Sequence, residues 1–279
     1  MDSTDLQAWT GRSETLNDTV TAAPVRMLRA MLDLQPDPTP PALPPLWHWL
    51  YFLPSARQSE LGPDGHPKRG GFLPPVPLPR RMWAGGQLEF FHPLRLGDAI
   101  GRVSTIDDVT VKPGRSGELC FVRVRHEISS PRGLALREFH DIVYRPHPVP
   151  GAPAPAAEPA PDAQWSETIV PDDVLLFRYS ALTFNGHRIH YDRRYVTGVE
   201  GYPGLIVHGP LLATLLAGLG GRQFPGREAA SFTFRALKPV FDLHSFDICG
   251  RLDGKDAAEL WVRDHEGHRA MAARIEMRA

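Results

Sequence analysis

Residues 206–219 read Ile-Val-His-Gly-Pro-Leu-Leu-Ala-Thr-Leu-Leu-Ala-Gly-Leu and carry almost no charge. The run is shorter than the ~18 apolar residues that a membrane span needs. A helix that is apolar on every side must be buried. Pro210 suits its first turn, because the missing N–H would have no partner there. The stretch therefore predicts a core helix around which a sheet has to wrap.

The residues around this run predict the sheet. A strand and a helix are expected before it and four strands after it, with turns such as residues 265–267 between them. The first part of the chain carries a weaker copy of this order. Residues 89–98 parallel 235–242 about a proline-centred turn, and 121–125 parallel 260–264 as alternating strands. The repeated order predicts two halves of related architecture.

The first half has helical candidates of its own. Residues 21–34 and 43–53 are expected to be helical, and the second of these is rich in aromatic side chains. Residues 68–79 form an irregular segment of glycines and prolines. The first half is thus expected to combine two helices with its strands.

A Pro/Ala-rich run, residues 146–163, marks the boundary between the halves. It has little apolar bulk to bury and cannot join a sheet, so we expect a semi-extended, solvated tether. The predicted organisation is an N-terminal half over residues 1–145, a linker over 146–164 and a C-terminal half over 165–279.

The composition argues against several classes of protein. The 279 residues carry a formal net charge of −1, and the arginines are scattered among acids, so no nucleic-acid partner is expected. The 2 cysteines lie in separate strand-like runs, which makes a disulfide framework or a zinc site improbable. Residues 1–5 are acidic and polar, unlike the start of a signal peptide. We expect a cytoplasmic protein that does not enter a membrane.

The chemistry-bearing motif lies just before the apolar run. Residues 178–192 read Arg-Tyr-Ser-Ala-Leu-Thr-Phe-Asn-Gly-His-Arg-Ile-His-Tyr-Asp and place an amide, Asn185, beside two imidazoles, His187 and His190. Groups that hold water and move protons, next to the N-terminus of a buried helix, suit chemistry beside a polarised carbonyl.

This motif resembles the signature of MaoC-like hotdog hydratases and dehydratases, Asp-x-Asn-Pro-[Ile/Leu]-His preceded by a Tyr and a Ser/Thr. Tyr179 matches the Tyr, Asn185 takes the Asp position and His187 the Asn position. Ile189 and His190 match the apolar residue and the catalytic His. The full string is most similar to the hydroxyacyl-thioester dehydratases, close to the branch that hydrates mesaconyl-CoA or itaconyl-CoA.

The resemblance implies an α+β double hotdog, in which two antiparallel sheets each wrap round a central helix and pack as a pseudo-dimer. The C-terminal half would hold the catalytic motif, whereas the N-terminal half would have lost catalysis and would widen the acyl pocket. The partner would be an acyl-CoA thioester, with no metal and no cofactor beyond the CoA of the substrate. A homodimer or higher homo-oligomer is left open.

The motif departs from the family signature at Asn185, which stands where the signature has Asp, and this difference bears on which residue transfers protons. An amide has no useful basicity near neutral pH, so Asn185 is expected to hold the attacking water. Proton transfer then falls to a histidine, whose unperturbed pKa of ~6.5 suits the task. His190 is our first choice for the catalytic base. His187 is expected either to act as a second acid or base or to anchor the loop.

The start of the apolar run completes the expected site. The N–H of Gly209 would donate to the thioester carbonyl, since orphan N–H groups lie at a helix N-terminus. Tyr179, His208 and Pro210 are expected to contact the substrate, with His208 in a positioning role. Arg188, flanked by other arginines, is expected to bind a second substrate carboxylate. The remaining arginines, including Arg80 and Arg81, are expected to be solvated charges.

The predicted function is reversible hydration of a short branched or dicarboxylic 2-enoyl-CoA thioester, of the itaconyl-CoA or mesaconyl-CoA type. Three alternatives stay open: a 3-hydroxyacyl-thioester dehydratase of fatty-acid metabolism, a hotdog thioesterase, and a non-catalytic thioester-binding hotdog protein.

Overall fold

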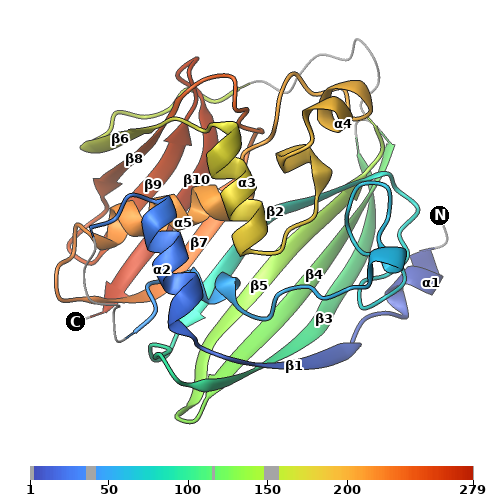
Figure 1. Ribbon diagram of the computed structural model, residues 1–279, viewed down its shortest axis with the longest axis horizontal. Helices are drawn as coiled ribbons and strands as arrows, with labels where there is room; N and C mark the ends of the chain where they lie inside the picture. Colours follow the sequence, from blue (N-terminus) through green and yellow to red (C-terminus); the bar gives the residue numbers. More distant parts are fainter. Residues whose placement is uncertain (1–2, 36–41, 115–116, 148–156, 279) are drawn as a thin grey trace.

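The computed structural model describes residues 3–35, 42–114, 117–147 and 157–278. Within them, ten strands form one antiparallel sheet in the order β1-β3-β4-β5-β2-β7-β10-β9-β8-β6 (Figure 1). The strands are β1 Ser13–Thr19, β2 Arg80–Phe90, β3 Ala99–Gly114, β4 Gly117–Ser130, β5 Gly133–Arg145, β6 Trp165–Ile169, β7 Glu228–Ala236, β8 Phe246–Leu252, β9 Ala257–Arg263 and β10 Arg269–Arg278. The helices are α1 Ser3–Gln7, α2 Ala22–Met31, α3 Asp173–Leu182, α4 Arg193–Gly198 and α5 Gly209–Gly221, with 3₁₀ turns η1 Trp47–Leu50, η2 Gln58–Glu60 and η3 Arg188–His190.

The two expected sheets are joined edge to edge into one. Strands β1–β5 come from the first half of the chain and β6–β10 from the second, and β2 pairs with β7 at the seam. A Cβ on Gly86 would lie 2.8 Å from a ring carbon of Phe234 and 2.9 Å from the Phe139 carbonyl oxygen. Glycine therefore lets the aromatic ring of β7 lie directly on β2.

The apolar run forms the predicted core helix, α5, which packs against β7, β8, β9 and β10. Leu211 and Leu216 are fully buried. The helix begins at Gly209, later than Ile206, because the preceding residues are extended. The N–H of Val207 donates to the Val240 carbonyl over 2.9 Å, and Ile206 forms a bridge with Phe241.

The N-terminal half contains no such long apolar helix within the described residues. The prediction for residues 21–34 is confirmed as α2, but the helix expected over 43–53 is wrong: only η1 forms there. Leu46 at φ 70° and Phe52 at φ 55° have left-handed backbone that interrupts a helix on both sides. The segment is nevertheless buried through its aromatic and aliphatic side chains. The N-terminal sheet is thus covered by short pieces, which leaves space beneath them.

The expectation that the Pro/Ala run cannot join a sheet is wrong at its C-terminal end. Residues 148–156 lie outside the described residues. Beyond them, Pro159 forms a bridge with His268, and the N–H of Arg269 donates to the Glu158 carbonyl over 2.8 Å. Proline lacks an N–H, but the residues on either side supply the bonds, as Ala160 does to Gly267 over 2.9 Å. This end of the run is therefore docked on the turn between β9 and β10.

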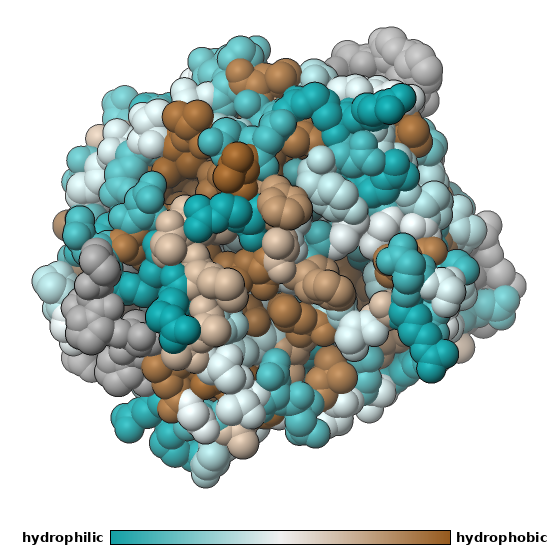
Figure 2. Space-filling view, viewed as in Figure 1, coloured by the Kyte–Doolittle hydropathy of each residue, from teal (hydrophilic) through white to brown (hydrophobic). Residues whose placement is uncertain are grey.

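Helices α2 and α3 lie side by side in front of the sheet (Figure 1). Figure 2 shows apolar side chains toward the middle of this face, bordered by hydrophilic residues, and Met27, Val174 and Phe177 are each more than half exposed. None of the helices in the described part of the chain is long and apolar enough to cross a membrane.

Candidate active site

The motif of residues 178–192 begins in the last turns of α3 and continues on the loop between α3 and α4, residues 183–192, which we call the motif loop. Both flanking helices start at an aspartate N-cap. Asp172 accepts from Leu175 N over 2.7 Å, and Asp192 accepts from Tyr195 N over 3.0 Å. Such caps fix where a helix begins. Phe184, at φ 49°, turns the chain sharply as it leaves α3.

The motif loop and the start of α5 border one cavity of about 440 Å³, here the first cavity. A second cavity, of about 940 Å³, lies beneath the N-terminal segments. The two share six wall residues: His66, Arg81, Trp83, His140, Asn185 and Pro210. The site is therefore placed where the two spaces meet, between the two halves of the sheet.

His190 lies in the wall of the first cavity as a buried, neutral imidazole. Burial lowers the pKa of His190 to about 4. Its Nδ1 lies 2.7 Å from the Ile206 carbonyl oxygen, so Nδ1 carries the proton and donates it to that acceptor. Nε2 is then left with a free lone pair, which is the form that a general base requires.

His208 does not contact either cavity, although we expected it to bind substrate. Its ring is fully buried and stacks on His190, with centroids 3.8 Å apart and an 18° tilt. Its Nε2 lies 2.8 Å from Ser180 Oγ. Tyr179 packs edge-on against the same ring at 4.9 Å. The buried His208 ring therefore packs directly against the His190 ring.

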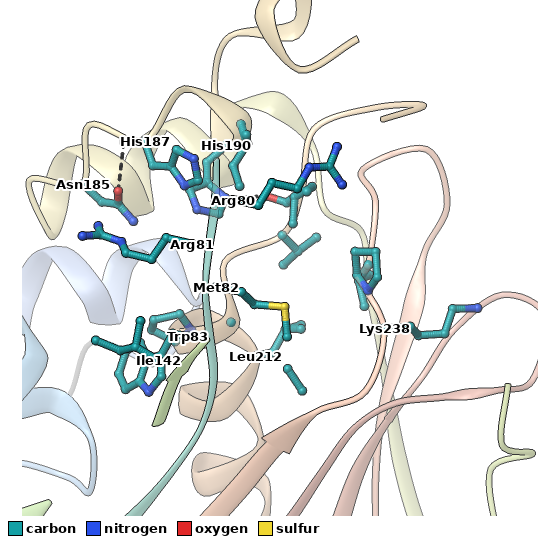
Figure 3. A pocket seen from close by; sticks show the side chains of 18 of the residues that line it. Arg80, Arg81, Met82, Trp83, Ile142, Asn185, His187, His190, Leu212 and Lys238 are labelled. Carbon is teal, nitrogen blue, oxygen red and sulfur yellow. Dashed lines mark hydrogen bonds between the residues drawn. The ribbon is translucent and has the colours of Figure 1, made fainter. Parts of the chain in front are cut away.

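Asn185 lines both cavities through an oriented amide. Its Oδ1 accepts the N–H of His187 over 3.0 Å, which identifies the oxygen, since only an acceptor can face that donor (Figure 3). The Nδ2 group remains to donate to a water or to substrate.

Tyr179 borders the second cavity but is 2 % exposed, and burial raises the pKa of its hydroxyl.

The N-terminus of α5 faces the first cavity, where Gly209 and Pro210 form part of the wall. A Cβ on Gly209 would meet nothing within 4 Å, so packing does not demand a glycine there. No backbone acceptor in the described residues takes the Gly209 N–H. This donor, at the positive end of a 13-residue helix, is available to a developing oxyanion.

Arg188, which we expected to bind a substrate carboxylate, already has protein partners. It borders the second cavity, but its guanidinium donates to Asp192 over 2.7 Å and to the Pro63 carbonyl over 2.9 Å. It also lies over the Tyr195 ring at 4.1 Å. Its neighbour Arg193 pairs with Asp173 and Asp242.

The arginine that faces the site instead is Arg81, from β2 of the N-terminal half. Figure 3 shows Arg80 and Arg81 leaving the strand on opposite sides, with Arg81 directed toward Asn185. Arg80 is bonded to the Glu200 carbonyl over 2.6 Å and lies 3.4 Å from its carboxylate. Arg81 contacts the Tyr144 hydroxyl and lines both cavities. Sequence reasoning missed it because nothing in the chain links Arg81 to a motif about a hundred residues away.

His187 lines the first cavity and meets a second histidine that the sequence did not suggest. Its ring lies 5.4 Å from His190 and perpendicular to it, and 4.0 Å from His66. Burial, followed by the neighbouring His66, lowers the pKa of His187. His66 and Asp64 belong to the N-terminal half. The only signal for them was an acid and an imidazole two residues apart among glycines and prolines.

Comparisons with known proteins bear on the family and the fold of this chain. The family model for hydroxyacyl-thioester dehydratase type 2 matches residues 46–242. A mesaconyl-C(4)-CoA hydratase of Chloroflexus aurantiacus is 48% identical over 285 residues, covering 99% of each chain. A MaoC-like dehydratase from Phytophthora capsici has a similar structure, with TM-score 0.70 at 14% identity, covering 100% of this chain and 99% of that one.

A Mycobacterium tuberculosis protein with a double hotdog fold also matches, with TM-score 0.58 at 14% identity over 96% of both chains. At these identities the two structures bear on the fold alone, and they identify the ten-stranded sheet as a double hotdog. The sequence matches bear on the chemistry, since the family and the relative are named as dehydratase and hydratase. The chain therefore belongs to the hydroxyacyl-thioester dehydratase type 2 family and is a hydro-lyase with a double hotdog fold.

Proposed function

We propose that the protein catalyses the reversible hydration of a short 2-enoyl-CoA thioester that carries a second carboxylate, of the mesaconyl-CoA type. The observation that carries the proposal is the meeting of a neutral His190 and the free Gly209 N–H at one cavity. A base and an oxyanion donor that face the same space suit addition of water next to a thioester carbonyl.

The reaction balances with these groups alone. The Gly209 N–H stabilises negative charge on the thioester oxygen as water adds to C3. Nε2 of His190 takes one proton from that water, and the Nδ2 group of Asn185 donates a hydrogen bond to its oxygen. The proton then passes to C2 as the carbonyl re-forms, which restores neutral His190. The forward reaction consumes one water, and the reverse reaction releases it.

The choice of substrate rests on Arg81 and on the relative from Chloroflexus aurantiacus, which is named as a mesaconyl-C(4)-CoA hydratase. Arg81 borders both cavities at their junction and makes no ion pair among the described residues. A guanidinium binds a carboxylate strongly, particularly where water is excluded. A short acyl chain with a second carboxylate would bring that group to Arg81.

A second candidate is favoured by one observation. The second cavity, of about 940 Å³, adjoins the site and has room for a longer acyl chain. A 3-hydroxyacyl-thioester dehydratase of fatty-acid metabolism would use that space. The two candidates predict opposite trends with chain length.

The test is a panel of mesaconyl-C(4)-CoA, itaconyl-CoA, crotonyl-CoA and a longer 2-enoyl-CoA, with the enoyl-thioester absorbance and free thiol followed in parallel. We expect loss of absorbance without thiol release, and kcat/KM highest for a dicarboxylic substrate. Arg81→Gln should remove that preference while sparing crotonyl-CoA, and Arg178→Gln, at an exposed position on α3, is the matched control. Thiol release would indicate a thioesterase, a rate that rises with chain length would indicate the fatty-acid enzyme, and binding without turnover would indicate a non-catalytic protein.

A further inference from the structure

Asp64 and His66 lie on a tight loop, residues 62–67, that crosses from the N-terminal half to the motif loop. The Arg188 N–H donates to the Asp64 carbonyl over 2.9 Å. Gly65 has φ +87°, and a Cβ on it would overlap the Gly186 carbonyl oxygen. A Cβ on Gly186 would in turn lie 2.9 Å from the Gly65 carbonyl oxygen. The two loops are therefore in backbone contact, which only glycines permit at these positions.

This contact fixes an aspartate–histidine pair at the edge of the site. Asp64 Oδ2 lies 3.0 Å from His66 Nδ1, and Asp64 Oδ1 accepts the backbone N–H of His66 over 3.1 Å. The carboxylate can only accept, so His66 carries its proton on Nδ1 and presents a bare Nε2. His66 itself lines both cavities.

The pair reaches the catalytic histidines through ring contact. The His66 and His187 rings are 4.0 Å apart, and His187 is 5.4 Å from His190. One ligand atom each from Asp64, His66 and His187 lies within 4.8 Å of the others. A carboxylate and three imidazoles thus form one continuous group, of which the first two members come from the N-terminal half.

The charges around His187 give the carboxylate a specific task. The charged and titratable groups that face His187 are His66, His190, Arg81 and Asp64. Burial and the three basic neighbours all oppose protonation, and Asp64 favours it. For Asp64, burial opposes ionisation, but the hydrogen bond and the charge of His66 outweigh it and hold its pKa below the usual range. Asp64 therefore offsets positive charge when a proton reaches this group.

We propose that Asp64, acting through His66, supplies to the histidines of the motif loop the carboxylate that Asn185 does not provide. Asp64 is a positioning residue that orients His66 and stabilises transient positive charge on His66 and His187 during proton transfer. The inference rests on the proposed hydration and names the residues that complete its proton-handling group. It gives the N-terminal half a part in the chemistry, where we had expected it only to widen the pocket.

The kinetic test compares Asp64→Asn, Asp64→Glu and the control Glu60→Gln. Glu60 lies just before the loop, and among the described residues its carboxylate accepts a hydrogen bond only from Arg57 N. Each variant is assayed with the best substrate of the wild type. We expect Asp64→Asn to lower kcat by about 10²-fold, with a much smaller change in KM, as for loss of a group that acts in proton transfer. Asp64→Glu should recover part of the rate. Removal of the negative charge should also move to lower pH the part of the kcat/KM profile that reports protonation of His66 and His187, because Asp64 raises the pKa of both histidines.

A second measurement does not depend on turnover. Nitrogen chemical shifts of labelled histidines should report His66 protonated on Nδ1 in the wild type, and Asp64→Asn should alter the signals of both His66 and His187. Unchanged shifts, or a kcat and pH profile of Asp64→Asn equal to those of Glu60→Gln, would overturn the inference. So would loss of turnover on chelation with recovery on added Zn²⁺, which would make Asp64, His66 and His187 metal ligands. Failure of the wild type to hydrate any thioester would count against the proposed function. The histidine chemical shifts would still test whether Asp64 acts on His66 and His187.

Discussion

Replacement of His190 can separate its proposed chemical role from its structural role, because each role uses a different ring nitrogen. In the proposed reaction Nε2 is the base, while Nδ1–H bonds to the Ile206 carbonyl over 2.7 Å. His190→Ala removes both. Loss of a general base costs about 10²–10⁴-fold in rate. A buried carbonyl left without its donor costs about 1–3 kcal/mol of unfolding free energy.

His190→Asn tests this division. The asparagine amide can donate where Nδ1–H donated, but it has no basic nitrogen at the position of Nε2. We expect the kcat of His190→Asn to fall as far as that of His190→Ala, by about 10²–10⁴-fold relative to wild type. Its free energy of unfolding should fall less than that of His190→Ala. His147→Ala, at an exposed position, is the control.

The assay is steady-state hydration of the best thioester together with denaturant unfolding of each variant. If His190→Ala lost less than tenfold in kcat, His190 would not be the base. If Ala and Asn lowered the free energy of unfolding equally, the hydrogen bond to Ile206 would not stabilise the fold. The assignment of the proton to Nδ1 would then be wrong.

Three further predictions follow from the same contacts. Asn185→Asp should keep appreciable activity or change the pH profile of the rate, because its Oδ1 can still accept the His187 N–H, whereas Asn185→Ala should be much less active. Wild-type rates for both variants would show that Asn185 has no part in the reaction. The pKa of His190 is about 4 in the folded protein and ~6.5 in the unfolded chain, so the unfolded chain binds more protons between these values. The free energy of unfolding should therefore fall as the pH drops from about 6.5 to 4, by up to about 3 kcal/mol. A His190→Asn variant with the same pH dependence in unfolding experiments would contradict this. Cleavage of the chain between residues 147 and 157 should leave the halves associated on gel filtration, because β2 pairs with β7, and free separation would count against one joined sheet.

The sequence predicted those parts of the molecule that are contiguous in the chain. The core helix follows from an apolar run without charge, and the motif loop follows from fifteen ordered residues. Within the loop, Arg188 has a partner that we did not anticipate. Asp192 lies four residues further on, and the two form an ion pair across one turn. That spacing is visible in the sequence, although we expected Arg188 to bind a substrate carboxylate.

The residues that sequence reasoning missed reach the site from the other half. Arg81, His66 and Asp64 are brought there by the pairing of β2 with β7 and by the contact of two glycines, Gly65 and Gly186. Neither event leaves a local pattern. From the sequence alone, a glycine needed for a turn cannot be distinguished from a glycine needed for contact with a distant loop.

The two halves differ in what covers the sheet, because the described residues of the N-terminal half include no helix as long and apolar as α5. The second cavity lies against η1 and the segment that follows it, and its wall holds a buried acid, Glu138. This carboxylate accepts from Trp49 over 3.0 Å and lies 2.6 Å from His48 Nε2, with His140 also bonded to it. A wholly buried carboxylate is tolerated only when donors surround it, as they do here. Such a network holds the wall of an open cavity in place where a helix would otherwise have packed. If substrate enters the second cavity, as the second candidate function requires, the polar contacts of Glu138 line the space that it would occupy.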